Sequence, residues 1–139
     1  MYRWLVRTMI RSSLRKHQAG DVEGLMKAYA KDVHFVFPGK NSWATDTRDK
    51  AVLADWLRRF HAAGLKIDVD DIIVGGAPWD TRVCMHFTDH AKDANGRIVY
   101  ENTGVIYGKA KWGKITDYVV YEDTEKVAAL DAYLQKVGV

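Results

Sequence analysis

The stretch RVCMHFTDHAKDANGRIVYENTGVIYGKAKWGKITDYVVYE, residues 82–122, decides the fold of this chain. Apolar and polar residues alternate in three runs within it, Arg82–Asp89, Val99–Gly108 and Lys114–Glu122, and such alternation is typical of half-buried strands. The dipeptide Asn95-Gly96 separates the first two runs and favours a tight hairpin turn, because both residues tolerate a positive φ. Three long neighbouring strands need cover on one face, so the stretch predicts a sheet packed against helices.

Most of the preceding sequence predicts helix. Apolar residues recur every three or four positions from Tyr2 to His17, and they do so again in two later segments and at the end of the chain. A short strand, Val33–Phe37, separates the second helix from the third. The residues that signal the later helix boundaries are Asp21, Thr47 and Gly64, with Asp123 or Thr124 before the last helix.

The segment Leu65–Val74 predicts a further strand whose alternation slips by one residue. Its apolar residues fall at 65, 67 and 69, then at 72 and 74, and the slip lies at Asp70-Asp71. One extra residue in a strand produces a β-bulge, which bends a sheet sharply. We therefore expect one α+β domain over residues 1–139, a cone in which three N-terminal helices and a C-terminal helix cover a strongly bent, mostly antiparallel sheet.

Composition narrows the functional class. The single Cys84 cannot form an internal disulfide, and no apolar run approaches the roughly 18 residues of a membrane helix, so we expect a cytoplasmic protein without membrane contact. Four arginines, Arg3, Arg7, Arg11 and Arg15, share one helical face that could meet phosphate or an acidic partner. No aromatic residues interleave them, so we interpret this face as solvated and do not expect nucleic acid binding.

Strand register places a row of polar residues on the concave face of the sheet. A two-residue turn at Asn95-Gly96 puts Asp89 opposite Asn102, on the more apolar face of the first hairpin. A three-residue loop ending at Gly113 then puts Glu122 opposite Asn102. A two-residue loop would instead bring Tyr121 beside Asn102 and turn Glu122 outward.

This row suggests acid–base chemistry. Partly desolvated carboxyl groups have raised pKa values, so Asp89 or Glu122 could transfer a proton to or from a ligand that Asn102 holds. The alternative is that the row lies at the solvated rim and makes structural hydrogen bonds. Trp43 would either close the pocket mouth or pack beneath its loop. The predicted ligand-binding residues are Phe35, Phe37, Trp43, Trp56, Phe60, Tyr100, Asn102, Tyr118 and Val120.

No metal site or cofactor is expected. His86 and His90 share one face of a strand, but no third ligand stands at metal-binding spacing. His34 alternates outward, and we place His17 and His61 on helix exteriors or ends.

Two phrases carry a family resemblance: GDVEGLMKAYAKDVHFVFPG at residues 20–39 and ENTGVIYGKAKWGKITDYVVYEDT at residues 101–124. With the order of elements, they resemble the SnoaL-like branch of the nuclear transport factor two-like, or cystatin-like, superfamily. The resemblance implies a cone with a pocket between its concave face and the helices, and a homodimer formed through the convex face. This superfamily contains isomerases, cyclases, dehydratases, epoxide hydrolases and binding domains, so it leaves the reaction open.

The positions that carry catalysis in two branches of this superfamily hold other residues here. The position of the ketosteroid isomerase base holds Phe37, and the positions of its oxyanion donors hold Ser13 and Gly104. The base of the polyketide cyclases falls at about Val120. The sequence therefore predicts a pocket for a flat, largely apolar metabolite, either with proton transfer by Asp89 or Glu122 or as a non-catalytic binding or dimerisation module.

Overall fold

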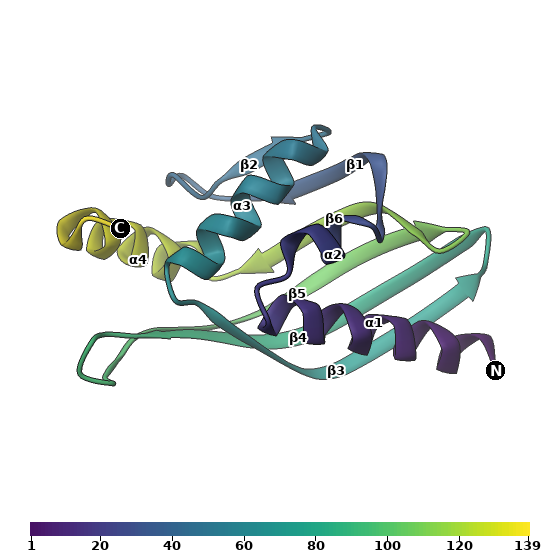
Figure 1. Cartoon of the computed structure of the whole chain (residues 1–139), viewed down its shortest axis with the longest axis horizontal. Helices are drawn as coiled ribbons and strands as arrows, with labels where there is room; N and C mark the ends of the chain where they lie inside the picture. The colour runs from purple at the N-terminus through teal and green to yellow at the C-terminus, as the bar shows by residue number, and fades with distance from the viewer.

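Six strands form one bent sheet, with α1, α2 and α3 across one face and α4 at its end, in a computed structural model that describes residues 1–139 (Figure 1). The strand order is β2-β1-β6-β5-β4-β3, and all neighbours are antiparallel except β1 and β6. The predicted α+β class and bent sheet are thereby confirmed. The elements are α1 Tyr2–Gln18, α2 Val22–Met26, β1 Tyr29–Phe37, β2 Thr45–Thr47, α3 Lys50–Ala62, β3 Lys66–Ala77, β4 Asp80–Lys92, β5 Ile98–Lys111, β6 Lys114–Glu122 and α4 Thr124–Val137.

The slip in β3 is a β-bulge, as the sequence predicted. Val69 pairs with Phe87 and Asp71 pairs with His86, so Asp70 is the extra residue on its strand. An extra residue on one strand increases the local bend and twist. The bulge lies within β3, the edge strand of the bent sheet (Figure 1).

The first hairpin has the predicted register but a longer turn. Asp89 pairs with Asn102, as expected. The turn spans Asp93 to Arg97, and the backbone N–H of Asp93 donates to the Arg97 carbonyl at 2.8 Å. A register shift at the end of β4 then restores the predicted pairing.

The second hairpin has the two-residue loop that was the alternative prediction, but its register differs from both predicted pairings. Its turn has two residues, Trp112 with φ 49° and Gly113 with φ 80°. A second irregularity, between Lys109 and Ala110, shifts the ladder, so that Glu122 pairs with Gly104. The predicted pairing of Glu122 with Asn102 is therefore wrong by two residues.

The predicted face of this strand is nevertheless the observed one. A shift of two residues preserves the alternation of side chains, because the period of a strand is two. Glu122 is half-buried on the concave side, whereas Tyr121 is 56% exposed.

Two helix boundaries differ from the sequence prediction. Asp49 caps α3, because its carboxylate accepts a hydrogen bond from the Ala51 N–H at 2.9 Å, and Thr47 belongs to β2. The second helix ends at Met26, and Tyr29 begins β1. No helix combines the length and the apolar character that crossing a membrane requires.

Candidate functional site

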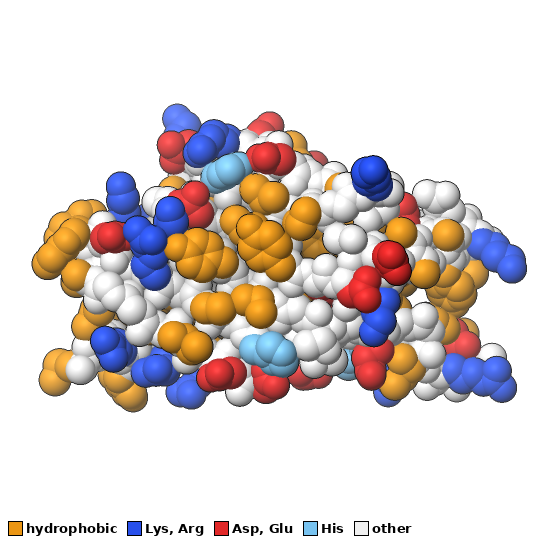
Figure 2. All heavy atoms as spheres, turned by 180° about the vertical axis from the view of Figure 1, so that it is seen from behind, with side chains coloured by type: hydrophobic (Ala, Val, Ile, Leu, Met, Phe, Trp, Pro, Cys, Tyr) orange, Lys and Arg blue, Asp and Glu red, His pale blue; other side chains and the backbone are white.

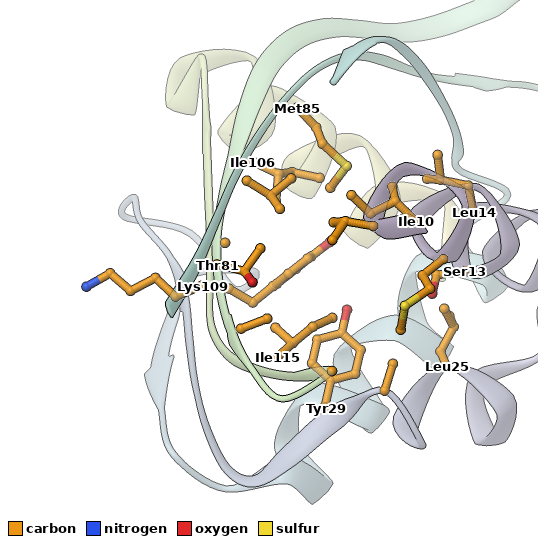
Figure 3. A pocket seen from close by; sticks show the side chains of 18 of the residues that line it. Ile10, Ser13, Leu14, Leu25, Tyr29, Thr81, Met85, Ile106, Lys109 and Ile115 are labelled. Atoms are coloured by element: carbon orange, nitrogen blue, oxygen red, sulfur yellow. The ribbon is translucent and has the colours of Figure 1, made fainter. Parts of the chain in front are cut away.

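A cavity of about 430 Å³ lies between α1 and the concave face of the sheet (Figure 3). Its wall on the helix side is the apolar stripe of α1, including Ile10 and Leu14, and its wall on the sheet side includes Met85, Ile106 and Ile115. Seventeen of its 24 lining residues are hydrophobic. An apolar hollow of this size suits a small molecule.

The stripe of α1 that should bury against the sheet remains partly open. Leu5 is 48% exposed and Met9 is 45% exposed, although both line the cavity. The helix stands away from the strands, and the Tyr2 hydroxyl meets the Thr81 hydroxyl at its first turn. Trp112 lines the mouth and is 72% exposed. The amphipathic pattern of α1 therefore serves the cavity wall as well as packing.

Besides Tyr2 and Thr81, four polar side chains line this largely apolar cavity: Ser13 and His17 from α1, Tyr29 from β1 and Tyr118 from β6. Burial raises the pKa of Tyr29 well above its ordinary value and that of Tyr118 to about 12, so both phenols are neutral hydrogen-bond donors. Lys109 also lines the cavity, but its ammonium end points away from the space (Figure 3).

His17 is the residue that the sequence interpretation misplaced. It is only 8% exposed, and its ring lies 5.1 Å from the Phe60 ring and 5.0 Å from the His61 ring, between centroids. Burial, with a smaller effect of His61, lowers the pKa of His17 to about 4, so the imidazole is neutral near pH 7. The available signal was its spacing, three residues after Leu14 on the apolar stripe.

Of the predicted ligand-binding residues, Tyr118 lines the cavity, and the others lie elsewhere. Trp56 sits at the centre of an aromatic cluster with Phe35, Phe37, Trp43 and Phe60, at ring centroid distances of 5.0 to 5.9 Å. Trp43 is 2% exposed and packs under Arg59, whose guanidinium carbon lies 3.9 Å from its ring centroid. These side chains fill the core. The buried members of the predicted set are Phe35, Phe37, Trp43, Phe60, Tyr100, Asn102 and Val120.

The predicted catalytic carboxyl groups form a buried pair beyond the cavity. Asp89 is 4% exposed, and one oxygen of each carboxyl group, Asp89 Oδ1 and Glu122 Oε2, has no hydrogen-bond partner. Burial raises the pKa of Asp89 to about 6, and burial together with the Asp89 charge raises the pKa of Glu122 to about 9. Two such groups hold a proton between them near neutral pH.

Asn102 has a structural set of partners. Its amide nitrogen donates to the Tyr100 hydroxyl and to the Asp123 carbonyl, each at 3.0 Å, and its oxygen accepts from the Thr103 N–H at 2.9 Å. Asp123 is the N-cap of α4. Asn102 thereby joins β5 to the start of the last helix.

Buried side chains separate the carboxyl pair from the cavity. Along β4 the cavity wall ends at Met85, and along β5 it ends at Ile106. The next residues on the same face, Phe87 and Gly104, do not line the cavity and are buried, as is Val120 on β6. The pair and the cavity are two separate features of one sheet face.

His34 and His86 contact carboxylates at the surface, and His61 packs against the His17 ring. His34 Nε2 lies 2.6 Å from Asp46, and His86 Nδ1 lies 2.6 Å from Asp70. No group of three or more His, Cys, Asp and Glu side chains gathers as metal ligands.

Comparison with known proteins identifies the fold. The sequence profile of the SnoaL-like domain matches residues 10–118. An NTF2-like protein of unknown function from Burkholderia pseudomallei superposes with a TM-score of 0.75 at 18% identity, over 90% of this chain and 95% of that one. A candidate polyketide cyclase from Xanthomonas campestris pv. campestris gives 0.68 at 17% identity, over 94% and 98%.

A third solved structure of similar fold was crystallised with a small molecule. TerC, co-crystallised with polyporic acid, superposes with a TM-score of 0.72 at 20% identity, over 88% of this chain and 95% of TerC. Among curated proteins, none matches this chain in sequence.

Proposed function

The chain belongs to the SnoaL-like domain family. We propose that it binds a flat, largely apolar small molecule in the cavity between α1 and the sheet. The observation that carries this proposal is the unfilled volume of about 430 Å³ under an apolar helix face. Native cores are packed with few voids larger than a water molecule. A hollow of this size therefore needs a reason, and an apolar ligand is the simplest one.

The polar groups of the cavity favour a ligand with a carbonyl or hydroxyl group. Tyr29 and Tyr118 can donate hydrogen bonds to an oxygen, and the Figure 3 view places the Tyr29 hydroxyl in the space that α1 covers. No carboxylate lines the cavity. The co-crystallisation of TerC with polyporic acid and the candidate polyketide cyclase of the same fold are consistent with this class of ligand.

A cavity-filling variant tests the proposal. We expect 2-naphthol to bind the wild-type chain in isothermal titration, and Ile106→Trp to weaken that binding at least about tenfold by occupying the space. Ile73→Trp is the matched control, because Ile73 is 60% exposed and lies outside the cavity. Equal binding by both variants would contradict the proposal.

Proton transfer by Asp89 or Glu122 is a second candidate function. The unpartnered buried oxygens of this carboxyl pair and their raised pKa values favour it. A substrate that entered from the cavity would have to pass the buried ring of Phe87 to reach them. If the pair is catalytic, Asp89→Asn should abolish turnover of a model enolisable ketone. Binding of 2-naphthol should remain, and unchanged turnover would exclude this role.

We also propose a homodimer formed through the convex face. Figure 2 shows that face, where hydrophobic side chains gather across the middle with charged side chains around them. The apolar and aromatic residues of β5 and β6 that are exposed or half-buried on this side include Val105, Tyr107, Val119 and Tyr121. Exposed apolar patches of this kind mark contact surfaces.

A further inference from the structure

We propose that the His17 imidazole accepts a hydrogen bond from a hydroxyl group of the ligand. The cavity therefore selects hydroxylated aromatic molecules, phenols or enols, over hydrocarbons and carboxylic acids. This inference rests on the proposed ligand-binding function and narrows its ligand class. It is separate from the carboxyl pair, which the cavity does not reach.

The first support is the position of His17. Ser13 and His17 lie four residues apart on α1, so they share the helix face that borders the cavity. Tyr29 comes from the opposite wall, and its hydroxyl projects into the space between the helix and the sheet (Figure 3). Polar groups of α1 and β1 therefore border the same cavity.

The second support is the hydrogen bonding of the imidazole. With its lowered pKa the imidazole is neutral near pH 7. A neutral imidazole has one N–H and one nitrogen lone pair, so one ring nitrogen is an acceptor. No other residue hydrogen-bonds to this ring; its neighbours are the rings of Phe60 and His61 in edge contacts.

The third support is the absence of competing bases and cations in the cavity. Its lining contains no carboxylate, and its one lysine, Lys109, directs its ammonium group outward (Figure 3). The hydroxyl groups in the lining, those of Tyr2, Ser13, Tyr29, Thr81 and Tyr118, are weaker acceptors than an imidazole nitrogen. A ligand O–H group therefore finds its best acceptor at His17.

The same lining residues disfavour the two alternative ligand classes, carboxylates and pure hydrocarbons. A carboxylate would lose its hydration without meeting a cation, which is costly in an apolar site. A pure hydrocarbon would leave the His17 nitrogen and the Ser13 hydroxyl without partners. A hydroxylated aromatic ring can donate to His17 and fill the apolar part of the cavity.

Three related probes test this inference: 2-naphthol, 2-methoxynaphthalene, which keeps the oxygen but lacks the donor, and naphthalene. We expect the wild-type chain to bind 2-naphthol about 5- to 15-fold more tightly than either analogue, as one hydrogen bond to a buried acceptor allows. His17→Leu should bind all three with similar affinity. His17→Gln, which retains an acceptor oxygen, should recover part of the preference.

The matched control is His86→Gln, because His86 lies on the exposed convex side and contacts Asp70 rather than the cavity. It should keep the full preference for 2-naphthol. If His17→Leu fails to fold, ¹⁵N NMR of the wild-type imidazole replaces it, and 2-naphthol should shift the unprotonated ring nitrogen of His17 whereas naphthalene should not.

The outcomes separate the inference from the function beneath it. Equal affinity of the wild-type chain for all three probes, or a preference that persists in His17→Leu, would overturn the role of His17 alone. Failure of the wild-type chain to bind any probe would overturn the ligand cavity, and the inference with it.

Discussion

Glu122 of β6 lies directly opposite Gly104 of β5, and the missing side chain of that glycine lets Glu122 and Phe87 approach each other across the sheet. A Cβ atom at position 104 would stand 2.8 Å from Glu122 Cβ and 2.8 Å from Phe87 Cζ, and closer still to the Tyr121 carbonyl oxygen. The buried carboxyl group and the aromatic side chain depend on this gap.

Gly104→Ala should therefore destabilise the fold. Overpacking against backbone and a buried ring costs about 1–3 kcal/mol, measured as the free energy of unfolding in urea. Gly75→Ala is the control, because a Cβ there meets nothing within 4 Å, and it should change stability by no more than about 0.5 kcal/mol. Equal effects of the two substitutions would contradict the packing around Glu122.

Glu122→Gln should stabilise the chain at alkaline pH. The folded-state pKa values of Asp89 and Glu122 are raised to about 6 and about 9, so the stability these groups contribute is complete below pH 4 and is lost as pH rises through these values. The glutamine cannot ionise. We expect the free energy of unfolding of the variant to exceed that of the wild-type chain by about 1–3 kcal/mol at pH 9, with a smaller difference at pH 4. Thermal unfolding at both pH values checks this, and parallel pH profiles would contradict it.

His17 should make the fold sensitive to acid. Its pKa is about 4 in the folded chain against an ordinary value of 6.5, so the unfolded chain binds the proton more readily between these values. Stability should fall as pH drops through this window, by up to about 3 kcal/mol. Chemical unfolding of the wild-type chain and His17→Gln at pH 4 and pH 7 measures the effect. If the free energy of unfolding falls equally in the wild-type chain and in His17→Gln between pH 7 and pH 4, His17 is not buried as a neutral ring.

A charged substitution on the convex face should dissociate the proposed dimer. Tyr121 is 56% exposed on that face, and Tyr121→Lys would place a cation within the apolar patch. Light scattering at micromolar concentration should give a dimer for the wild-type chain and a monomer for this variant. Lys136→Glu, on the exposed end of α4, should leave the dimer intact. A monomeric wild-type chain would contradict the proposal.

Local signals in the sequence were sufficient to predict the fold. The slip of alternation at Asp70 located the bulge, because one inserted residue reverses every later side chain. The Asn95-Gly96 signal gave the pairing of Asp89 with Asn102, although the turn itself is longer. The register of the second hairpin could not be predicted, because the extra residue of β6, Thr116, precedes the run Tyr118–Tyr121, which is apolar or aromatic at every position and hides the slip in alternation.

The cavity was harder to predict than the sheet. Periodicity shows which aromatic residues face inward, but it cannot show whether a space remains between them; Phe35 and Trp56 pack in a closed core, and Tyr118 lines the cavity. The space depends on how far α1 stands from the sheet, which is a tertiary property. His17 was overlooked because it lies at the end of its helix.

The position of a bound ligand tests the central claim most directly. In an NMR experiment with 2-naphthol and selectively methyl-labelled protein, we predict intermolecular NOEs from the ring protons to the methyl groups of Ile10, Met85 and Ile106, which line the cavity on opposite walls. NOEs confined to Ile73, which is exposed and outside the cavity, would contradict a ligand site between α1 and the sheet.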